Sequence, residues 1–110
     1  MERFVKGDLV VVSFPFSDLS ATKRRPALVL AYSGNRNYIL CQITSKTVKD
    51  DFAIVLEEQE IIEGNLIKLS NIRPNRIFTA EDSIIQYRIG KISPSISKMV
   101  VDKLIEILRS

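Results

Sequence analysis

Short apolar runs separated by proline, glycine and polar residues fill most of the chain, and this pattern predicts β-strands. The first expected strand covers residues 8–14 and is ended by Pro15, because proline cannot donate to a sheet ladder. Residues 15–25 are expected to form a loop. The second strand is expected over residues 26–32, with Pro26 at its first position, where strands tolerate proline.

A hairpin is predicted next, because the polar residues 33–37 are typical of a turn and residues 38–44 return to a strand pattern. A polar connection is expected over 45–51, followed by a strand over 52–56 and an acidic segment over 57–64 that ends in a turn at Gly64-Asn65. The next strand is expected over 66–73 and is stopped by Pro74. It is followed by an extended piece over 75–79 and by a strand within 83–92, with Gly90 as a kink or bulge.

The end of the chain changes from strand to helix periodicity. Ser93 followed by Pro94 is typical of an N-cap and a first helical residue. Apolar residues then recur at helical spacing, so a helix is expected over about residues 94–108. The apolar stripe consists of Ile96, Met99, Val100, Leu104, Ile107 and Leu108.

Several short strands followed by one helix, with no helices between the strands, indicate a mainly β (α+β) fold. The pattern favours a small closed or half-open barrel of antiparallel strands with a C-terminal helix packed on it. The chain has 110 residues, enough for one core and too few for a second, so residues 1–110 are expected to form a single domain.

Composition excludes several kinds of site. The chain has no histidine, which removes the commonest general base and metal ligand. Its one cysteine, Cys41, permits neither an intramolecular disulfide nor a thiolate zinc cluster, and its apolar surroundings indicate a core residue rather than a nucleophile. No apolar run approaches the length of a membrane span and no export leader is visible, so a cytoplasmic location is expected.

The net charge is +3, but the charges are segregated along the chain. Residues 1–49 carry eight basic and three acidic residues, residues 50–65 carry six acidic residues and no basic one, and residues 66–110 carry eight basic and four acidic residues. If folding joins the two basic blocks, they form a surface for a polyanion such as nucleic acid. The acidic residues lack a metal-ligand spacing and are interpreted as a solvated loop.

Three polar segments are candidates for binding or chemistry. Lys23-Arg24-Arg25 offers guanidinium forks suited to phosphate, just before a proline that fixes the chain direction. Thr44-Ser45-Lys46 places two hydroxyls and a cation at a strand end. Taken singly, the first segment is better described as a solvated turn and the second as strand-end capping. The third candidate set is Lys68, Ser70 and Arg73, with Arg76 beyond them.

Aromatic residues are a weaker signal. Aromatic side chains can stack on nucleic-acid bases, but in small β domains they belong more often to the core. The residues concerned are Phe14, Phe16, Tyr32 and Tyr38.

Taken together and in order, these segments resemble the MazF/PemK family of bacterial toxins, the endoribonucleases of type II toxin–antitoxin pairs. The match covers nearly the whole chain. The segments that carry it are Lys6-Gly7-Asp8-Leu9-Val10-Val11-Val12, Arg25-Pro26-Ala27-Leu28-Val29-Leu30, Gln42-Ile43-Thr44-Ser45-Lys46, Ser70-Asn71-Ile72-Arg73 followed by Ile77-Phe78-Thr79, and Ile89-Gly90-Lys91-Ile92.

The resemblance implies an SH3-like barrel of the plasmid-maintenance-toxin type, a homodimer, and cleavage of single-stranded RNA or mRNA without metal or cofactor. It implies a cognate antitoxin with an acidic, disordered segment, with DNA contacted only through that antitoxin. Carried over by position, Arg25 is the catalytic arginine and Thr44 the catalytic threonine. The residues then expected to bind RNA are Lys23, Arg24, Ser45, Lys46, Lys68, Ser70, Arg73 and Arg76.

Cleavage of this kind uses the 2′-hydroxyl as nucleophile and leaves a cyclic phosphate. Arg25, aided by the Thr44 hydroxyl, is expected to stabilise the charge that develops on the phosphorane. Arginine keeps its proton, so the proton acceptor is left open among water, a neighbouring acid and the RNA. The alternative function is a non-catalytic nucleic-acid-binding or interaction module built on a small β barrel.

Overall fold

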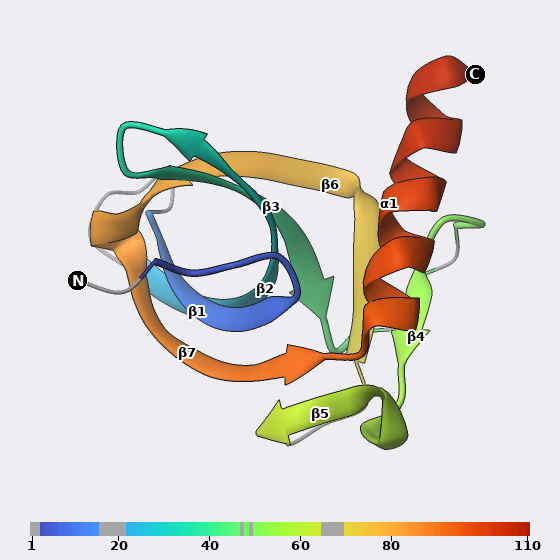
Figure 1. Cartoon of the computed structure of the whole chain (residues 1–110), viewed down its shortest axis with the longest axis horizontal. Coiled ribbons are helices and arrows are strands. Elements are labelled where there is room, and N and C mark those ends of the chain that lie inside the picture. The colour runs from blue at the N-terminus through green and yellow to red at the C-terminus, as the bar shows by residue number, and fades with distance from the viewer. Residues whose placement is uncertain (1–2, 16–21, 47, 49, 65–69) are drawn as a thin grey trace.

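The computed structural model describes residues 3–15, 22–46, 48, 50–64 and 70–110. Within this part of the chain, seven antiparallel strands form one sheet in the order β4-β6-β3-β2-β1-β7-β5 (Figure 1). The strands are β1 (Asp8–Pro15), β2 (Thr22–Gly34), β3 (Asn37–Thr44), β4 (Ile54–Leu56), β5 (Ile61–Gly64), β6 (Ser70–Glu81) and β7 (Ile85–Ile92), followed by the helix α1 (Pro94–Arg109).

The sheet curls into a half-barrel, and α1 packs beside it against β6 (Figure 1). This architecture confirms the predicted mainly β fold with a C-terminal helix. Two 3₁₀ turns, η1 (Glu58–Glu60) and η2 (Asp82–Ile84), precede β5 and β7. That residues 1–110 form a single domain stays a prediction.

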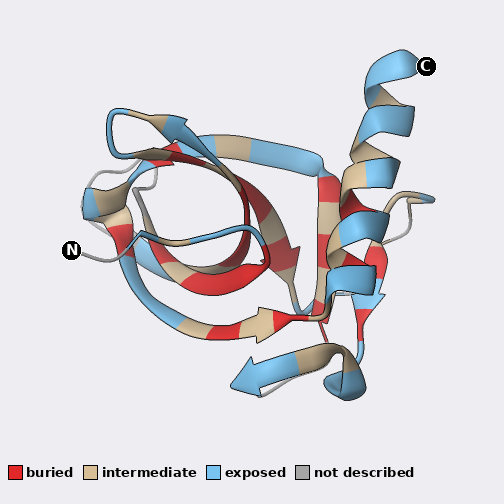
Figure 2. Ribbon diagram, in the orientation of Figure 1, coloured by how far each residue is buried: buried red, intermediate tan, exposed pale blue. Residues whose placement is uncertain are grey.

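Both faces of the curled sheet are buried, each by its own apolar cluster. Leu9 and Leu28 belong to the cluster covered by α1, whereas Val10 and Val29 belong to the cluster inside the curl. Because neighbouring residues of a strand point to opposite faces, a strand buried on both sides reads as an unbroken apolar run. Figure 2 shows buried residues along β1, β2 and β3, while β5 and the end of α1 are exposed.

The predicted hairpin between β2 and β3 is confirmed. Gly34 pairs with Asn37, and the two residues between them, Asn35 and Arg36, have positive φ angles of 51° and 65°. Two left-handed residues in a two-residue turn match the right-handed twist of the flanking strands. The local sequence was therefore sufficient to specify this element.

The predicted helix is also confirmed and begins where expected. The Ser93 side chain accepts a hydrogen bond from the backbone N–H of Ile96 at 3.3 Å, and Pro94 is the first helical residue. The Ser93 hydroxyl also donates to Glu60 Oε2 at 2.6 Å. The same residue thus caps α1 and ties it to η1.

The prediction of a loop over residues 15–25 is wrong at its end, because β2 begins at Thr22. The basic triplet is part of this strand: Arg25 is opposite Val12 and Arg24 opposite Ser13 of β1. Pro26 is therefore inside the strand rather than at its first position. Proline is tolerated there because the ladder on the other side of β2 starts only at Ala27.

The prediction that Pro74 stops a strand is also wrong. The strand β6 runs through Pro74, and the predicted extended piece over 75–79 is its continuation. The strand β6 accommodates the proline in a bulge: Cys41 of β3 is opposite Ile77, but the next residue, Gln42, is opposite Arg73, so residues 74–76 of β6 have no partner in β3. Such a bulge removes Pro74 from the ladder. The first part of that predicted strand lies outside the described residues.

The strand β5 was not predicted. Its Gly64 has a φ of 71° and approaches Gly90 of β7 so closely that a Cβ on Gly90 would lie 2.3 Å from the Glu63 carbonyl oxygen. Only glycine fits at this crossing. The predicted bulge near Gly90 is confirmed, because Leu9 pairs with Gly90 whereas Val10 pairs with Arg88. The strand expected over 52–56 is shorter and starts at Ile54.

Candidate functional site

A cleft of about 740 Å³ opens where the β2–β3 ladder ends. Its walls come from β1, β2, β3, β6 and β7, together with the segment that follows β3. Val11, Pro26 and Ile43 give it an apolar floor, and Thr44 and Ser45 bring hydroxyl groups. Strands that are far apart in the sequence therefore meet at one polar cleft.

Arg25 and Thr44 both line this cleft and lie on the same face of the sheet. The last pair of the β2–β3 ladder is Ala27 with Gln42. Because side chains alternate along a strand, the next positions on that face are Arg25 on β2 and Thr44 on β3. The two residues predicted to act together are thus neighbours across the open end of the ladder.

The Thr44 side chain has a defined role in the local hydrogen-bond network. Its Oγ1 accepts from the backbone N–H of Lys46 at 3.1 Å. Asn71 is opposite Thr44 in β6, and its Nδ2 donates to the Lys46 carbonyl oxygen at 3.2 Å. Accepting this bond occupies a lone pair of Thr44 Oγ1 and leaves its proton to be donated elsewhere. The Thr44 hydroxyl can therefore still donate its proton to a ligand in the cleft.

The charged residues among the described lining of the cleft are all basic: they are Lys23, Arg24, Arg25, Lys46 and Arg88. Lys23, Arg24 and Lys46 are exposed, and Arg25 is half-buried. A concave surface with one sign of charge concentrates the field and attracts ligands of opposite charge. The cleft therefore suits a polyanion.

Arg88 differs from the other cations because two carboxylates hold it. Its Nε donates to Asp8 Oδ1 at 3.0 Å, and its Nη2 donates to Glu63. Asp8 is buried and also accepts from the backbone N–H of Val5 at 2.9 Å. The hydrogen bond and positive charge of Arg88 lower the pKa of Glu63. These ion pairs neutralise Arg88 and join β1, β5 and β7 at the wall of the cleft.

The other predicted RNA-binding residues divide into three groups. Ser45, Lys46 and Ser70 line the cleft, as do Lys23 and Arg24. Lys68 lies outside the described residues. Arg73 and Arg76 are not among the lining residues. Arg73 instead donates from Nη2 to Asp50 Oδ2 at 3.0 Å, and Arg76 is exposed in the β6 bulge.

Asp50 organises the segment that leads away from the cleft. Its Oδ1 accepts from the backbone N–H groups of Phe52 and Ala53, and its Oδ2 accepts from the side chains of Arg73 and Asn75. Desolvation opposes the charge of Asp50, but these hydrogen bonds together outweigh it and lower its pKa. Asp50 is therefore an ionised anchor of this segment rather than part of a solvated loop.

Comparison with known proteins identifies the family. The family model of the PemK-like, MazF-like toxins of type II toxin–antitoxin systems matches residues 5–108. The chain belongs to this toxin family. No curated protein sequence matches it significantly.

Solved structures of toxins share the fold. MazF from Deinococcus radiodurans is similar with a TM-score of 0.78 at 20% identity, covering 100% of both chains. The MazE–MazF complex of the same organism is similar with a TM-score of 0.78 at 19% identity, covering 96% of both chains. An endoribonuclease in complex with its cognate antitoxin from a mycobacterial species is similar with a TM-score of 0.75 at 11% identity, covering 97% of this chain and 96% of that one.

Sequence reasoning missed the contribution of β7 to the cleft of this toxin-family member. Tyr87, Arg88 and Ile89 all line it. The predicted strand over 83–92 contained these residues, but only the sheet order, in which β7 lies beside β1, brings them to the cleft. No local signal in the sequence specifies that order.

Cys41 is confirmed as a core residue. It is fully buried, its Sγ donates to the Arg73 carbonyl oxygen at 2.9 Å, and burial raises its pKa to about 12. Within the described residues, no three side chains of the metal-ligating types gather to hold an ion. The helices in the same part of the chain are too short or too polar to cross a membrane.

Proposed function

We propose that this member of the PemK-like, MazF-like toxin family is an endoribonuclease that cleaves single-stranded RNA without a metal ion. The observation that carries the proposal is the placement of Arg25 and Thr44 on one sheet face at the open end of the β2–β3 ladder, both lining a basic cleft. A guanidinium and a hydroxyl donor side by side suit a phosphodiester. A solved relative of the same fold is itself described as an endoribonuclease.

The reaction is an internal transesterification. The ribose 2′-oxygen attacks the adjacent phosphorus, the bond from phosphorus to the 5′-oxygen breaks, and the products are a 2′,3′-cyclic phosphate and a 5′-hydroxyl. Arg25 and the Thr44 hydroxyl donate hydrogen bonds to the phosphorane oxygens, where negative charge accumulates. Donors fixed in advance stabilise such charge more than water does.

The reaction also moves two protons, one from the 2′-hydroxyl and one to the leaving 5′-oxygen. Arg25 is not the base, because an arginine guanidinium keeps its proton. No carboxylate is among the described residues that line the cleft. This favours water or the RNA itself as the proton carrier over an acidic side chain of the described part of the chain.

The same cleft supports a proposal for the partner. Two solved relatives are complexes of a toxin or endoribonuclease with its antitoxin. We propose that this chain, as a homodimer in the cytoplasm, binds a cognate antitoxin through an acidic segment that folds on binding. Charge complementarity with Lys23, Arg24 and Lys46 supports this mode.

The experiment that separates an enzyme from a binding module is cleavage of a long single-stranded RNA in the presence of EDTA. Discrete fragments that end in a 2′,3′-cyclic phosphate, formed by the wild type and not by Arg25→Ala, support the nuclease. Retardation of the RNA on a gel without fragments supports a non-catalytic module and rejects the nuclease.

A further inference from the structure

Tyr87 is an exposed aromatic side chain within the basic cleft. It is 50% exposed, and it lines the cleft together with Val11 and Pro26. The pairings of Val11 with Tyr87 on one side and with Pro26 on the other place these three residues in one row across β7, β1 and β2. Residues in one row of a sheet share a face. Tyr87 therefore stands at the edge of an apolar strip on the cleft floor.

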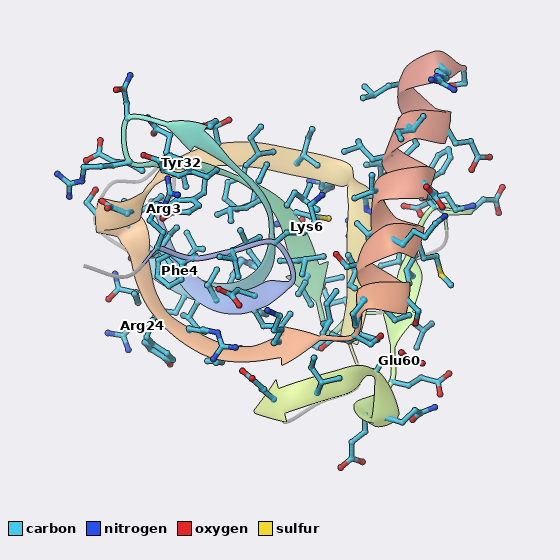
Figure 3. The ribbon with its side chains drawn as sticks, in the orientation of Figure 1. Arg3, Phe4, Lys6, Arg24, Tyr32 and Glu60 are labelled. Atoms are coloured by element: carbon cyan, nitrogen blue, oxygen red, sulfur yellow. The ribbon has the colours of Figure 1, made fainter. Side chains whose placement is uncertain are left out.

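The other exposed tyrosine of the described chain is packed within the fold. Tyr32 has the Arg3 guanidinium 4.5 Å from its ring centre, stacks edge-on against Tyr38 at 5.2 Å, and accepts a hydrogen bond from the backbone N–H of Arg36. Figure 3 places Arg3 and Tyr32 together at the hairpin end of the half-barrel, away from α1. The exposure of Tyr32 thus has a structural explanation, and Tyr32 is not among the residues that line the cleft.

Cations line the same cleft as the aromatic strip. Arg24 lies on the same face of β2 as Pro26, two residues away, and projects from the rim of the sheet in Figure 3. Lys23 and Lys46 add two more exposed positive charges to the same cleft. An apolar surface with a flat ring, bordered by cations, complements a ligand that is flat and apolar in one part and anionic in the next. A nucleotide has this composition.

We propose that Tyr87 is a stacking platform for a nucleobase of the bound RNA, while Arg24 and its basic neighbours hold the adjoining phosphates. Every nucleobase has a π-face, so stacking on an aromatic side chain contributes affinity with little sequence preference. The ladder to β1 holds the backbone of Tyr87 in place, which limits the entropy lost on binding. This inference rests on the proposed function and assigns one residue of its binding site.

The test measures the affinity of a single-stranded RNA that is 2′-O-methylated throughout, which removes the nucleophile. Tyr87→Ala is expected to weaken binding about 5- to 150-fold, the equivalent of one stacked base. Tyr87→Phe, which keeps the ring, is expected to bind within about twofold of the wild type. Tyr32→Ala is the matched control for loss of an exposed tyrosine, and thermal unfolding confirms that each variant is folded.

An abasic RNA of the same length identifies the group that Tyr87 contacts. If Tyr87 stacks on a base, wild type and Tyr87→Ala bind the abasic RNA equally. Equal affinity of the two proteins for the intact RNA overturns the inference. An equal loss of affinity of Tyr87→Ala for intact and for abasic RNA also overturns it. If Tyr87→Ala loses affinity only for an acidic peptide and not for RNA, Tyr87 belongs to a binding site for a protein partner, and the stacking inference is also overturned.

Failure of this inference differs from failure of the proposed function. Wild-type protein that cleaves unmodified RNA while Tyr87→Ala binds normally rejects only the role of Tyr87. Wild-type protein that neither binds nor cleaves RNA rejects both.

Discussion

Arg25 of β2 and Thr44 of β3 are the next same-face positions beyond Ala27–Gln42, the last pair of the β2–β3 ladder. The strands stop pairing just before these two residues, and a cleft lined by both opens there. A ladder end brings two polar side chains close without burying either of them in the sheet. Under the proposed function, this placement lets a guanidinium and a hydroxyl from two neighbouring strands act on one phosphate.

Removing the guanidinium is expected to abolish most cleavage without unfolding the protein. Arg25→Ala should lower the single-turnover cleavage rate on the order of 10²–10³-fold, because one preorganised donor is lost from the transition state. Arg25 is half-buried at the cleft rather than in either apolar cluster, so thermal unfolding should change little. A variant that unfolds at room temperature would instead assign Arg25 a structural role.

Removing the Thr44 hydroxyl is expected to act on chemistry more than on RNA binding. Thr44→Val keeps the branched shape and loses the donor, so kcat should fall while the affinity for a non-cleavable RNA stays close to that of the wild type. Thr44→Ser restores a hydroxyl and should recover most of the rate. Equal rates for Thr44→Val and wild type would exclude the hydroxyl from the reaction.

The pH dependence of cleavage should lack a histidine limb. The chain contains no histidine, and its cysteine is buried with a pKa of about 12. The logarithm of kcat should therefore show no inflection near about 6.5 that belongs to a protein group. Rates measured across this range on one RNA check the prediction, and an inflection near 6.5 assigned to the protein would contradict it.

Asp50 should make the stability of the fold sensitive to acid. Its pKa is lower in the folded protein than in the unfolded chain. Its ionised form therefore stabilises the fold at pH values above the ordinary aspartate pKa of about 3.9. That stability is lost as the pH falls below this value towards the folded pKa. Asp50→Asn should therefore unfold more easily at neutral pH, with the difference from wild type narrowing as the pH falls below about 4.

The measurement for Asp50 is denaturant unfolding at several pH values. Asp51→Asn is the matched control, because Asp51 is the exposed neighbour. Glu63, whose pKa Arg88 lowers, adds an acid dependence of its own that both variants retain. An unchanged difference between Asp50→Asn and wild type from pH 7 to pH 3 would contradict the assignment.

Elements specified by local sequence were predicted closely. The turn at Asn35-Arg36 and the cap at Ser93 depend on residues within a few positions of one another. The errors occurred where pairing with a strand that is distant in the sequence determines the local structure. Arg25 lies in a strand because β1 pairs with it. Pro74 lies in a strand because the pairing of β6 with β3 resumes on both sides of a bulge that contains the proline.

The site was predicted in the same uneven way. Arg25 and Thr44 were selected because their positions match short ordered motifs of the toxin family. Both line the cleft, and their catalytic role stays a prediction. Arg73 was expected in the binding set; it forms an ion pair with Asp50 and is not among the residues that line the cleft. The position of Tyr87 in the cleft lining was missed because only the order of strands in the sheet places β7 beside β1.

The most direct test of the central claim is a double-mutant cycle on single-turnover RNA cleavage in EDTA, with Arg25→Ala, Thr44→Val and the combined variant. If both side chains act on one phosphate, the combined loss in rate is much smaller than the product of the single losses, because either change already disables the shared site. Losses that multiply would show that the two residues act independently and would contradict the account.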